Sequence, residues 1–526
     1  MATGADLLVE HLFKAGVRVI FGMPGSHSTS IYDALHRHRG IRTILIRNEQ
    51  AGAYAADGYA RVTGKPGVIC TTAGPGATNA LSGVAEAYAD SVPVLLITGQ
   101  VNAARIHQEC GAYHEIDLDS IFRPCSKFVG TAMHHQQIPL LVERAFEAMT
   151  VGRPRPAALV LPQDIMGSEV AHPLLIIERY RGDSATIPVD LIRKAIELLK
   201  NAKRPLILAG GGAVWAGAEK EVRQLAEKLN CPVVTTLNGK GIIDERDPFS
   251  LGHARGVRAK AALPHADAMI AIGCRFTEIL TSFHTMPVPE NLIQLDIDSK
   301  QIGMNYPVKV PFPYDAKRTL EMLLIQMPEM RANAWGDLWQ QARTAKHPKP
   351  EWLIETLRKE LPEDAVVFTD ASEMALRMQG DFPAYAPRTF FYPSNYIALG
   401  WGFPAAVGAA VALPNRWIVS LSGDGGFTMT SQELATAAKY RLKLIAIVHN
   451  DQAYGAIRNL QRLHHEARYL DTELNNPDFL LLAQAYGIPA RRASNAVDFA
   501  NVLREAITRD GPSLIEVPDE WRYLRI

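Results

Sequence analysis

Residues 417–455 read WIVSLSGDGGFTMTSQELATAAKYRLKLIAIVHNDQAYG. In this stretch an apolar strand, Trp417–Leu421, runs into the glycine turn Ser422–Gly426, and a second apolar strand follows at Leu444–Val448. Two such strands joined by one helix form a parallel pair within a sheet that helices cover. The pattern therefore predicts an α/β fold. Because ligands bind beyond the carboxyl ends of parallel strands, the residues that follow each strand are the candidates for function.

Two carboxylates follow these two strands. Asp424 lies among Gly423, Gly425 and Gly426, and Asp451 comes after the second strand. Neighbouring parallel strands bring their carboxyl ends together, so we expect the two carboxylates to lie close to each other. Glycine amides can then approach a phosphate while the carboxylates hold a hard cation such as Mg²⁺. The alternative interpretation is a glycine turn beside an unrelated Asx turn.

The rest of the chain alternates short β-branched runs with amphipathic helices in three series, which predicts three doubly wound parallel-sheet domains at residues 1–168, 186–341 and 352–526. The periodicity breaks between residues 167 and 186, and the polar residues 342–351, with two prolines, suit a linker. The other strands that we expect are Val17–Phe21, Thr43–Ile46, Val68–Thr71, Val94–Thr98, Leu159–Leu161, Leu206–Leu208, Val233–Thr235, Met269–Ile272, Ile293–Ile297, Val366–Thr369 and Ser513–Val517.

The composition argues against several classes of function. The 526 residues carry 55 basic and 55 acidic side chains, so no excess charge favours binding to nucleic acid or to an anionic membrane surface. No run approaches the ~20 apolar residues of a membrane span, and the acidic first ten residues do not resemble a secretory leader, so we expect a cytoplasmic protein. The five cysteines lack a Cys-x-x-Cys spacing and indicate neither disulfides nor a zinc site.

The strand-end motif resembles the fingerprint of thiamine diphosphate enzymes, a Gly-Asp-Gly start and an Asn-Asn finish. Here it reads Gly423-Asp424-Gly425 and Asn450-Asp451. The resemblance implies a magnesium ion on Asp424, Asp451 and Ala453. One difference is that Asp451 stands in place of the second Asn, which adds negative charge beside a diphosphate and changes cofactor affinity. The same resemblance makes residues 352–526 a diphosphate-binding domain, with Gly423, Gly425, Gly426, Tyr454, Gly455, Ser372 and Glu373 as its cofactor-binding residues.

A second motif, Arg47-Asn48-Glu49-Gln50 followed by small residues up to Arg61, opens a helix. A glutamate in a first helical turn is usually there because the helix dipole favours it. This segment, however, is similar to the one that carries the essential glutamate of thiamine diphosphate enzymes related to acetolactate synthase. That implies a carboxylic acid at Glu49 sharing a proton with the cofactor's pyrimidine N1′, in a pyrimidine-binding domain at residues 1–168. The resemblance continues through Thr72–Ala80, Asp90–Gln100 and Arg123–Lys127, and it assigns Pro24, Gly25, Thr72 and Asn79 to cofactor binding.

A third motif, Asn395–Ala406, places Leu399 before a Gly-x-Gly sequence. A bulky apolar residue there would normally be core packing. In the resembled family this position wedges the cofactor into a bent form, which makes Leu399 both a catalytic and a cofactor-binding candidate.

The central series has glycines and an acid at its strand ends. Gly210 and Gly211 follow one strand, Arg275 lies just after another, and Asp296 ends a third. This arrangement is typical of a Rossmann-like nucleotide pocket. In acetolactate synthases the corresponding pocket holds FAD, and in other relatives it holds ADP or nothing; all three alternatives stay open.

Other positions depart from true acetolactate synthases. Leu460 replaces a Trp of the second-substrate site, and Tyr113 and His114 replace Phe and Gln. His27 stands where those enzymes have an aliphatic residue and where benzaldehyde lyase, another relative, has a histidine. His27 and His114 are candidates for relaying protons, since imidazole titrates near neutral pH, or they are simply hydrogen-bonded loop residues.

These features leave three hypotheses. The first is a decarboxylase and carboligase that acts on a 2-oxoacid such as pyruvate. The second is a lyase, like benzaldehyde lyase or a 2-hydroxyacyl-thioester lyase, that cleaves carbon–carbon bonds without decarboxylation. The third is a non-catalytic paralogue, against which Glu49 and Asp424 count. In the resembled family each cofactor joins two chains, which implies a homodimer at minimum and a homotetramer as the common assembly.

Overall fold

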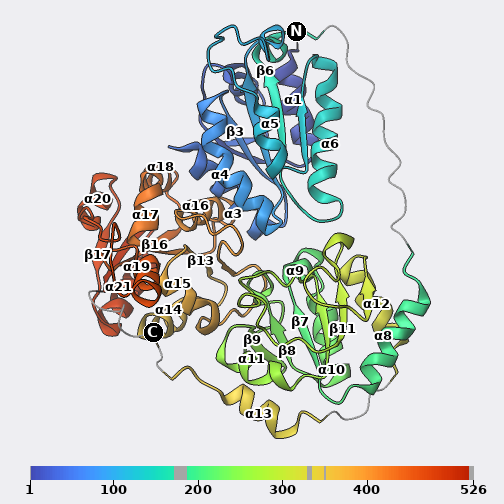
Figure 1. Cartoon of the computed structure of the whole chain (residues 1–526). Helices are drawn as coiled ribbons and strands as arrows, with labels where there is room; N and C mark the ends of the chain where they lie inside the picture. Colours follow the sequence, from blue (N-terminus) through green and yellow to red (C-terminus); the bar gives the residue numbers. More distant parts are fainter. Residues whose placement is uncertain (1, 171–185, 329–333, 349–350, 520–526) are drawn as a thin grey trace. The chain divides into compact units, whose positions relative to one another are not determined.

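The computed structural model describes residues 2–170, 186–328, 334–348 and 351–519, so most of the predicted break at 167–186 lies outside the described residues. Three parallel six-stranded sheets with flanking helices confirm the predicted α/β fold; in Figure 1 they follow one another from blue through green to orange and red. The chain divides into two compact units. One holds Met1–Arg181, Tyr396–Arg492 and Arg509–Ile526, and the other holds Gly182–Asn395 and Ala493–Thr508.

The first sheet has the strand order β2-β1-β3-β4-β6-β5. The chain runs outward from β1 to β2 and then returns to β3, so the switch point of the sheet lies between β1 and β3. The strands are β1 (Val19–Gly22), β2 (Arg42–Leu45), β3 (Gly67–Thr71), β4 (Val94–Gln100), β5 (Phe128–Thr131) and β6 (Ala157–Pro162). The helices are α1 (Gly4–Lys14), α2 (Thr29–Arg37), α3 (Glu49–Thr63), α4 (Pro75–Asp90), α5 (Leu118–Phe122), α6 (Ile138–Thr150) and α7 (Gln163–Gly167).

The second sheet has the order β12-β11-β10-β7-β8-β9, with its switch point between β7 and β10. Its strands are β7 (Pro205–Ala209), β8 (Val233–Thr235), β9 (Ser250–His253), β10 (Ala268–Ile272), β11 (Asn291–Leu295) and β12 (Val310–Phe312). The helices of this region are α8 (Val189–Asn201), α9 (Gly211–Ala216), α10 (Glu219–Leu229), α11 (Val257–Ala262), α12 (Ala316–Gln326) and α13 (Gly336–Thr344).

In the third sheet β15 pairs with β16, β16 with β18 and β18 with β17, and β13 pairs with β14; all of these pairs are parallel. The strands are β13 (Val366–Thr369), β14 (Phe390–Phe391), β15 (Ile418–Gly423), β16 (Leu444–Asn450), β17 (Ala490–Arg492) and β18 (Ser513–Pro518). The helices are α14 (Trp352–Glu360), α15 (Glu373–Asp381), α16 (Gly402–Ala412), α17 (Asp424–Thr430), α18 (Leu434–Lys439), α19 (Gly455–His464), α20 (Phe479–Ala485) and α21 (Ala496–Thr508).

Close packing of α3 against α16 joins the first and third series of elements within one unit. Two glycines permit the approach: a Cβ on Gly58 would collide with the carbonyl of Ala405, and a Cβ on Gly408 would collide with the carbonyl of Ala55. The small residues of α3 therefore allow a close contact between the backbones of the two helices.

Five strands were not expected from the sequence: β5, β9, β12, β14 and β17. Each lies at an edge of its sheet. Two other expectations were wrong by a few residues. The strand predicted at Ile293–Ile297 ends at Leu295, and α13 extends into the predicted linker as far as Thr344. A strand's carboxyl end is fixed by the last ladder bond and not by the last apolar residue, and half-exposed Ile297 lies beyond that bond.

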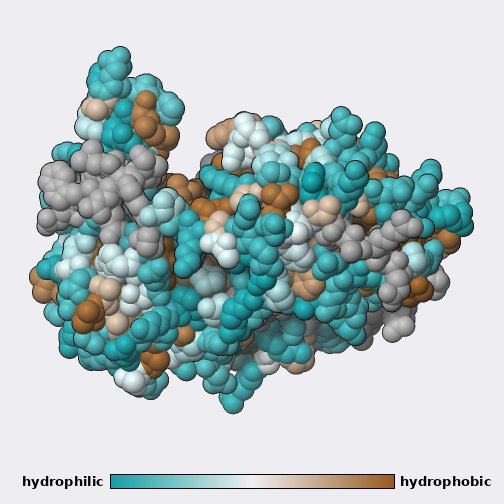
Figure 2. Space-filling view, turned by 90° about the horizontal axis from the view of Figure 1, so that it is seen from below, coloured by the Kyte–Doolittle hydropathy of each residue, from teal (hydrophilic) through white to brown (hydrophobic). Residues whose placement is uncertain are grey.

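The surface agrees with the neutral, mixed composition. The face drawn in Figure 2 is largely hydrophilic, and its hydrophobic residues occur in small separate groups. In the described ranges no helix is both long enough and apolar enough to cross a bilayer.

Candidate active site

Asp424 and Asp451 meet at the carboxyl edge of the third sheet. Asp424 begins α17 directly after β15, Asp451 follows β16, and the two strands pair in register up to Gly423 and His449. The two carboxyl groups share a hydrogen bond. The predicted juxtaposition of these side chains is therefore present in the structure.

A third member of this group, Asn476, was not predicted from the sequence. Asn476 Nδ2 donates to Asp424 Oδ2 at 2.6 Å and to Asn450 Oδ1 at 3.0 Å. Its Asn-Pro context indicates only a turn, so no local signal connects it with the strand ends.

Burial raises the pKa of both carboxyls, and the neighbouring charge of Asp424 adds to this effect and raises the pKa of Asp451 to about 7. Two buried like charges cannot both ionise at low cost without a cation, so the pair holds a proton that a divalent ion would displace. Among the described residues no group of three or more His, Cys, Asp and Glu side chains could hold a metal. A cation here would complete its coordination with backbone, water and phosphate oxygens, as Mg²⁺ does, so the pair fits that ion.

The glycine turn before α17 packs tightly against the start of α19. A Cβ on Gly425 would lie 2.6 Å from the ring of Tyr454, so only glycine fits there. Tyr454 is fixed by its backbone N–H, which donates to Thr472 O at 2.9 Å, and Gly455 begins α19. Asp451 Oδ1 accepts the Ala453 N–H at 3.3 Å, which ties this turn to the acidic pair.

Glu49 is the first residue of α3 and is buried, with 6% of its surface exposed. Asn48 caps the helix by accepting the Gln50 N–H at 2.8 Å. Asn79 of α4 donates to Glu49 Oε2 at 3.1 Å, and a Cβ on Gly76 would lie 3.2 Å from Glu49 Oε1. The predicted residues Glu49 and Asn79 are thus in direct contact, beside a glycine that leaves room at the carboxylate.

Glu433, which the sequence analysis did not identify, fixes the turn before Glu49. This buried side chain precedes α18, and its Oε1 accepts the backbone N–H groups of Arg47 at 2.9 Å and Asn48 at 3.1 Å. Its Oε2 accepts the Thr436 hydroxyl at 2.6 Å. The end of β2 and the start of α3 are therefore held from another part of the same unit.

The loops after β1 and β3 meet at the switch point of the first sheet, as the doubly wound topology requires. Gly25 lies against Thr72, since an added Cβ would be 2.5 Å from the Thr72 Cβ, and the His27 N–H donates to Thr72 Oγ1 at 3.3 Å. Pro24 is next to this contact in the chain. The structure thus brings Gly25, Thr72 and His27 together.

The two candidate histidines are also close to each other. The ring centroids of His27 and His114 are 5.4 Å apart, and Tyr113 stacks on His114 at 3.8 Å. Burial and the neighbouring His114 lower the pKa of His27, so its imidazole is neutral at pH 7. Ser26 Oγ lies 3.1 Å from His27 Nδ1.

Leu399 is 37% exposed, which excludes the alternative interpretation as a core residue. Its neighbour Trp401 is fully buried, and Gly400 takes a φ of 79°, which favours glycine. The segment therefore turns one side chain inward and leaves Leu399 half exposed. Leu460, on α19, is 50% exposed.

The candidates of the second unit form two separate groups. At its switch point a Cβ on Gly210 would collide with the carbonyl of Gly273, and a Cβ on Gly211 would lie 2.9 Å from the Asn238 Cβ. Asp296 follows the adjacent strand β11, is buried, and accepts the Asp298 N–H at 2.9 Å. The carbonyl of Arg275 accepts a hydrogen bond from Asn305. Separately, Ser372 caps α15 by accepting the Ala375 N–H at 3.2 Å, and Glu373 is the first residue of that helix.

Models of known protein families match three parts of the chain. Residues 2–121 match the N-terminal cofactor-binding domain of thiamine pyrophosphate (thiamine diphosphate) enzymes, residues 192–323 the central domain, and residues 370–517 the C-terminal cofactor-binding domain. The chain belongs to the thiamine pyrophosphate enzyme family. It is an acetolactate synthase-like enzyme, a carboligase or decarboxylase that depends on this cofactor.

Individual relatives cover nearly the whole chain. It is 35% identical to the probable acetolactate synthase large subunit of Methanocaldococcus jannaschii, over 98% of this chain and 91% of that protein. It is 34% identical to the probable 2-ketoarginine decarboxylase of Pseudomonas aeruginosa, over 98% of this chain and 94% of that protein. It is 32% identical to the acetolactate synthase isozyme 3 large subunit of Escherichia coli, over 96% and 92%. The hypothesis of a non-catalytic paralogue gains no support.

Proposed function

We propose that this enzyme releases CO₂ from pyruvate or a related 2-oxoacid and joins the remaining acyl unit to a second carbonyl compound. The observation that carries the proposal is the buried carboxyl of Glu49, held by Asn79 at the start of α3 and left accessible by Gly76. When bound, thiamine diphosphate supplies the thiazolium carbon that accepts the electron pair of the breaking bond. The protein supplies binding, orientation and proton transfer.

The proposed roles combine the family resemblance with the geometry of each group. Glu49 would exchange a proton with the pyrimidine ring of the bound cofactor, and Pro24, Gly25, Thr72 and Asn79 would help to hold that ring. Asp424 and Asp451, with the carbonyl of Ala453, hold Mg²⁺. Leu399, half exposed beside buried Trp401, orients the cofactor. The diphosphate contacts are assigned to Gly423, Gly425, Gly426, Tyr454, Gly455, Ser372 and Glu373.

The histidine pair supports a role in the last proton transfer. A neutral His27 beside His114 can accept a proton from a substrate hydroxyl or pass one on. Proton delivery to the acyl unit would release an aldehyde, whereas attack on a second carbonyl gives a ligated product. A decarboxylase among the relatives keeps both outcomes within the range of the family.

Three further assignments belong to the proposal. The central pocket around Gly210, Gly211, Arg275 and Asp296 takes an adenine nucleotide, FAD or ADP. The chain assembles as a homodimer at minimum and as a homotetramer in full. We place it in the cytoplasm, where the five free cysteines stay reduced.

The test is an NMR time course with thiamine diphosphate, Mg²⁺ and pyruvate, run in parallel with Glu49→Gln. We expect the wild-type protein to consume pyruvate and form acetolactate, or acetaldehyde and acetoin where the histidines deliver protons. Glu49→Gln should abolish turnover, because an amide cannot exchange the proton. Full activity in this variant would overturn the mechanism.

The lyase hypothesis makes a different prediction for the same experiment. Unchanged pyruvate, together with cleavage of an acyloin or of a 2-hydroxyacyl thioester without release of CO₂, would favour it. Release of CO₂ from a 2-oxoacid separates the two hypotheses, since the lyase makes no use of decarboxylation.

A further inference from the structure

Four charged side chains lie buried between α3 and α4: Asp57 and Arg61 from α3, and Glu86 and Asp90 from α4. We call them the inner cluster. None is more than 4% exposed. Arg61 Nε lies 2.5 Å from Asp57 Oδ1, and Arg61 Nη2 lies 3.0 Å from Asp90 Oδ2 but 4.0 Å from Glu86 Oε1. Arg61 therefore binds two of the three carboxylates closely and Glu86 only weakly.

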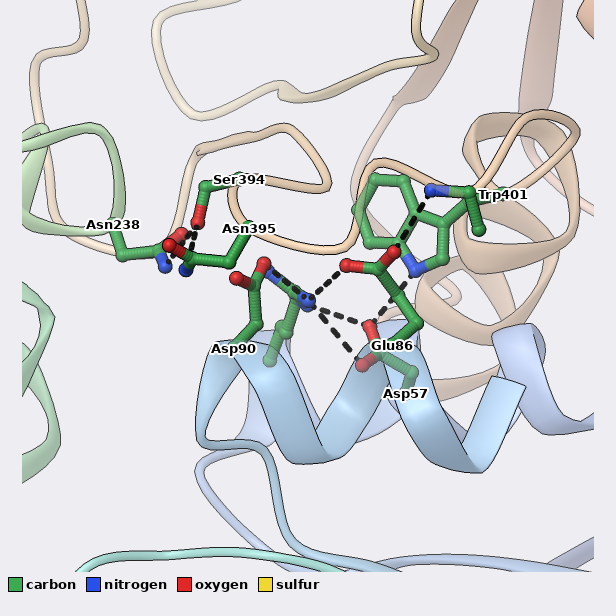
Figure 3. A network of polar contacts seen from close by, with 9 residues as sticks. Asp57, Glu86, Asp90, Asn238, Ser394, Asn395 and Trp401 are labelled. Carbon is green, nitrogen blue, oxygen red and sulfur yellow. Dashed lines mark hydrogen bonds and ion pairs between the residues drawn. The ribbon is translucent and has the colours of Figure 1, made fainter. Parts of the chain in front are cut away.

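The inner cluster also holds the segment that carries Leu399. Glu86 Oε2 accepts the backbone N–H of Ala398 at 3.0 Å, and Asp57 Oδ1 accepts the indole N–H of Trp401 at 3.1 Å. In Figure 3 the carboxyl groups of Asp57 and Glu86 lie beside the Trp401 ring, and Asp90 lies farther to the left. The Arg61 guanidinium lies 4.8 Å from the centroid of that ring. Hydrogen bonds to buried carboxyls thus bracket Leu399 on both sides.

The charges of the inner cluster do not balance if every acid is ionised. Three carboxylates face the one guanidinium of the inner cluster, and a buried carboxylate without close compensation is very costly. Glu86 lies farthest from that guanidinium, and among the described residues its Oε1 has no hydrogen-bond partner. Burial and the charge of Asp90 raise the pKa of Glu86 well above its usual range. A proton on Glu86 removes the charge of that carboxyl and leaves Oε2 able to accept the Ala398 N–H.

We propose that Glu86 is a positioning residue, a neutral carboxylic acid that, together with Asp57, fixes residues 398–401 and so sets the placement of Leu399. The inference rests on the proposed role of Leu399 in orienting the cofactor. Within the described part of the chain Glu86 makes no close ion pair that would bind α3 to α4, and it accepts a hydrogen bond from the backbone beside Leu399 instead. Its function is therefore the anchoring of that segment.

Hydrogen exchange in the cofactor-free protein tests the anchor without any use of activity. Glu86→Gln keeps a neutral acceptor of the same shape, whereas Glu86→Ala removes the acceptor, and Glu147→Ala on the exposed face of α6 is the control. We expect exchange of the amides in residues 396–401 to speed up at least about fivefold in Glu86→Ala and to change less than about twofold in Glu86→Gln and in the control. Unchanged exchange in Glu86→Ala would overturn the proposal.

Infrared difference spectra of wild type minus Glu86→Gln test the proton. We expect the carbonyl stretch of a protonated carboxylic acid at pH 7 in the wild type and its loss in the variant. A carboxylate band in its place, or a loss of amide protection in Glu86→Gln as large as in Glu86→Ala, would overturn the neutral-acid assignment. If Glu86→Ala does not fold, the infrared comparison and the Glu86→Gln exchange still decide the question.

Kinetics separate this inference from the proposed function. Glu86→Ala should lower kcat several-fold with little change in the Kd of thiamine diphosphate, because the segment stays attached through Trp401 but loses its register. Leu399→Ala should lower kcat as well. Full activity in Leu399→Ala would refute the role of Leu399 in the proposed function, while the exchange experiment would still report on the anchor.

Discussion

One compact unit contains two groups of closely spaced carboxylates, and their negative charges are compensated in different ways. The inner cluster encloses its own cation, Arg61, which lies within 3.0 Å of Asp57 and Asp90. At the other pair, Asp424 accepts a hydrogen bond from the amide of Asn476, and His449 lowers the pKa of both Asp424 and Asp451. Buried acids that bind a guanidinium of the same chain stabilise the fold. Acids that share a proton at a strand end can instead exchange that proton for a metal ion.

The location of each group agrees with this difference. The inner cluster is buried between two helices, and its members bind one another and the segment around Leu399. The strand-end pair lies at the carboxyl edge of a parallel sheet, where ligands of doubly wound folds bind. Removing the cation should therefore damage folding in the first group, and removing an acid should damage ligand binding in the second.

The largest effect should come from Arg61→Met, which removes the guanidinium that buried Asp57 and Asp90 bind. We expect a loss of about 3–5 kcal/mol of stability, measured by urea unfolding followed by circular dichroism. The matched control is Arg193→Met, which breaks an ion pair whose side chains are 73% and 80% exposed and should cost less than about 1 kcal/mol. Adding Asp57→Asn and Asp90→Asn to Arg61→Met should recover most of the loss. Equal effects of the two arginine variants would remove the distinction between a buried and a surface pair.

The next largest effect concerns the strand-end pair. Asp424→Asn should weaken Mg²⁺-supported binding of thiamine diphosphate by about 100-fold, because the ligand with the full charge is lost. Asp451→Asn should stay within about tenfold of the wild type, because the fingerprint that this chain resembles has Asn at that position. Cofactor titrations at several Mg²⁺ concentrations measure both effects. The reverse order of the two variants would mean that Asp451 is the principal ligand.

A pH series tests the proton that Asp424 and Asp451 share. The pKa of Asp451 in the folded protein is about 7, above its value in an unfolded chain, so this group binds a proton more tightly when folded. The stability that it contributes is complete below about pH 4 and is lost as the pH rises to about 7, with the folding constant falling about tenfold per pH unit. Mg²⁺ affinity should rise over the same range, since the metal displaces the proton. The difference between wild type and Asp451→Asn isolates this group, and identical pH profiles would contradict the assignment.

The sequence predicted the framework well because central strands carry a strong signal. Strands buried on both faces, such as β3 and β10, are continuous apolar runs. The five strands that were missed lie at sheet edges, where one neighbour is absent and pairing can be short or irregular. β14 has two residues, and two of the three residues of β17 are exposed arginines. Such strands form because the neighbouring strand presents backbone N–H and C=O groups for pairing. The position of that neighbour is part of the tertiary structure and cannot be read from the edge strand's own sequence.

The site was predicted only where a residue belongs to a recognisable local motif. Glu49, Asp424 and Asp451 stand at strand ends or helix starts, whereas Asn476 and Glu433 come from segments with no motif and reach the site only through the fold. Glu86 and Asp90 did carry a signal. Two acids four residues apart in an otherwise uncharged helix repel each other unless a cation comes from elsewhere, so the spacing itself indicates a partner such as Arg61.

The smallest expected effect extends the comparison to a third buried acid. Glu433 is stabilised mainly by neutral donors, namely the backbone N–H groups of Arg47 and Asn48 and the Thr436 hydroxyl, with a smaller contribution from the charge of Arg47. Glu433→Gln keeps an acceptor for both backbone groups and should cost about 1 kcal/mol or less.

Glu433→Ala provides the contrast, because it removes the acceptor of two partly exposed backbone donors, at about 0.5–1.5 kcal/mol each, and frees the turn that places Glu49. We therefore expect Glu433→Ala to lower kcat with little effect on the Kd of thiamine diphosphate, while Glu433→Gln keeps both. Thermal unfolding and steady-state kinetics measure the pair. If Glu433→Gln loses as much activity as Glu433→Ala, the negative charge of Glu433 acts on Glu49 directly, and the geometry of the turn is not the cause.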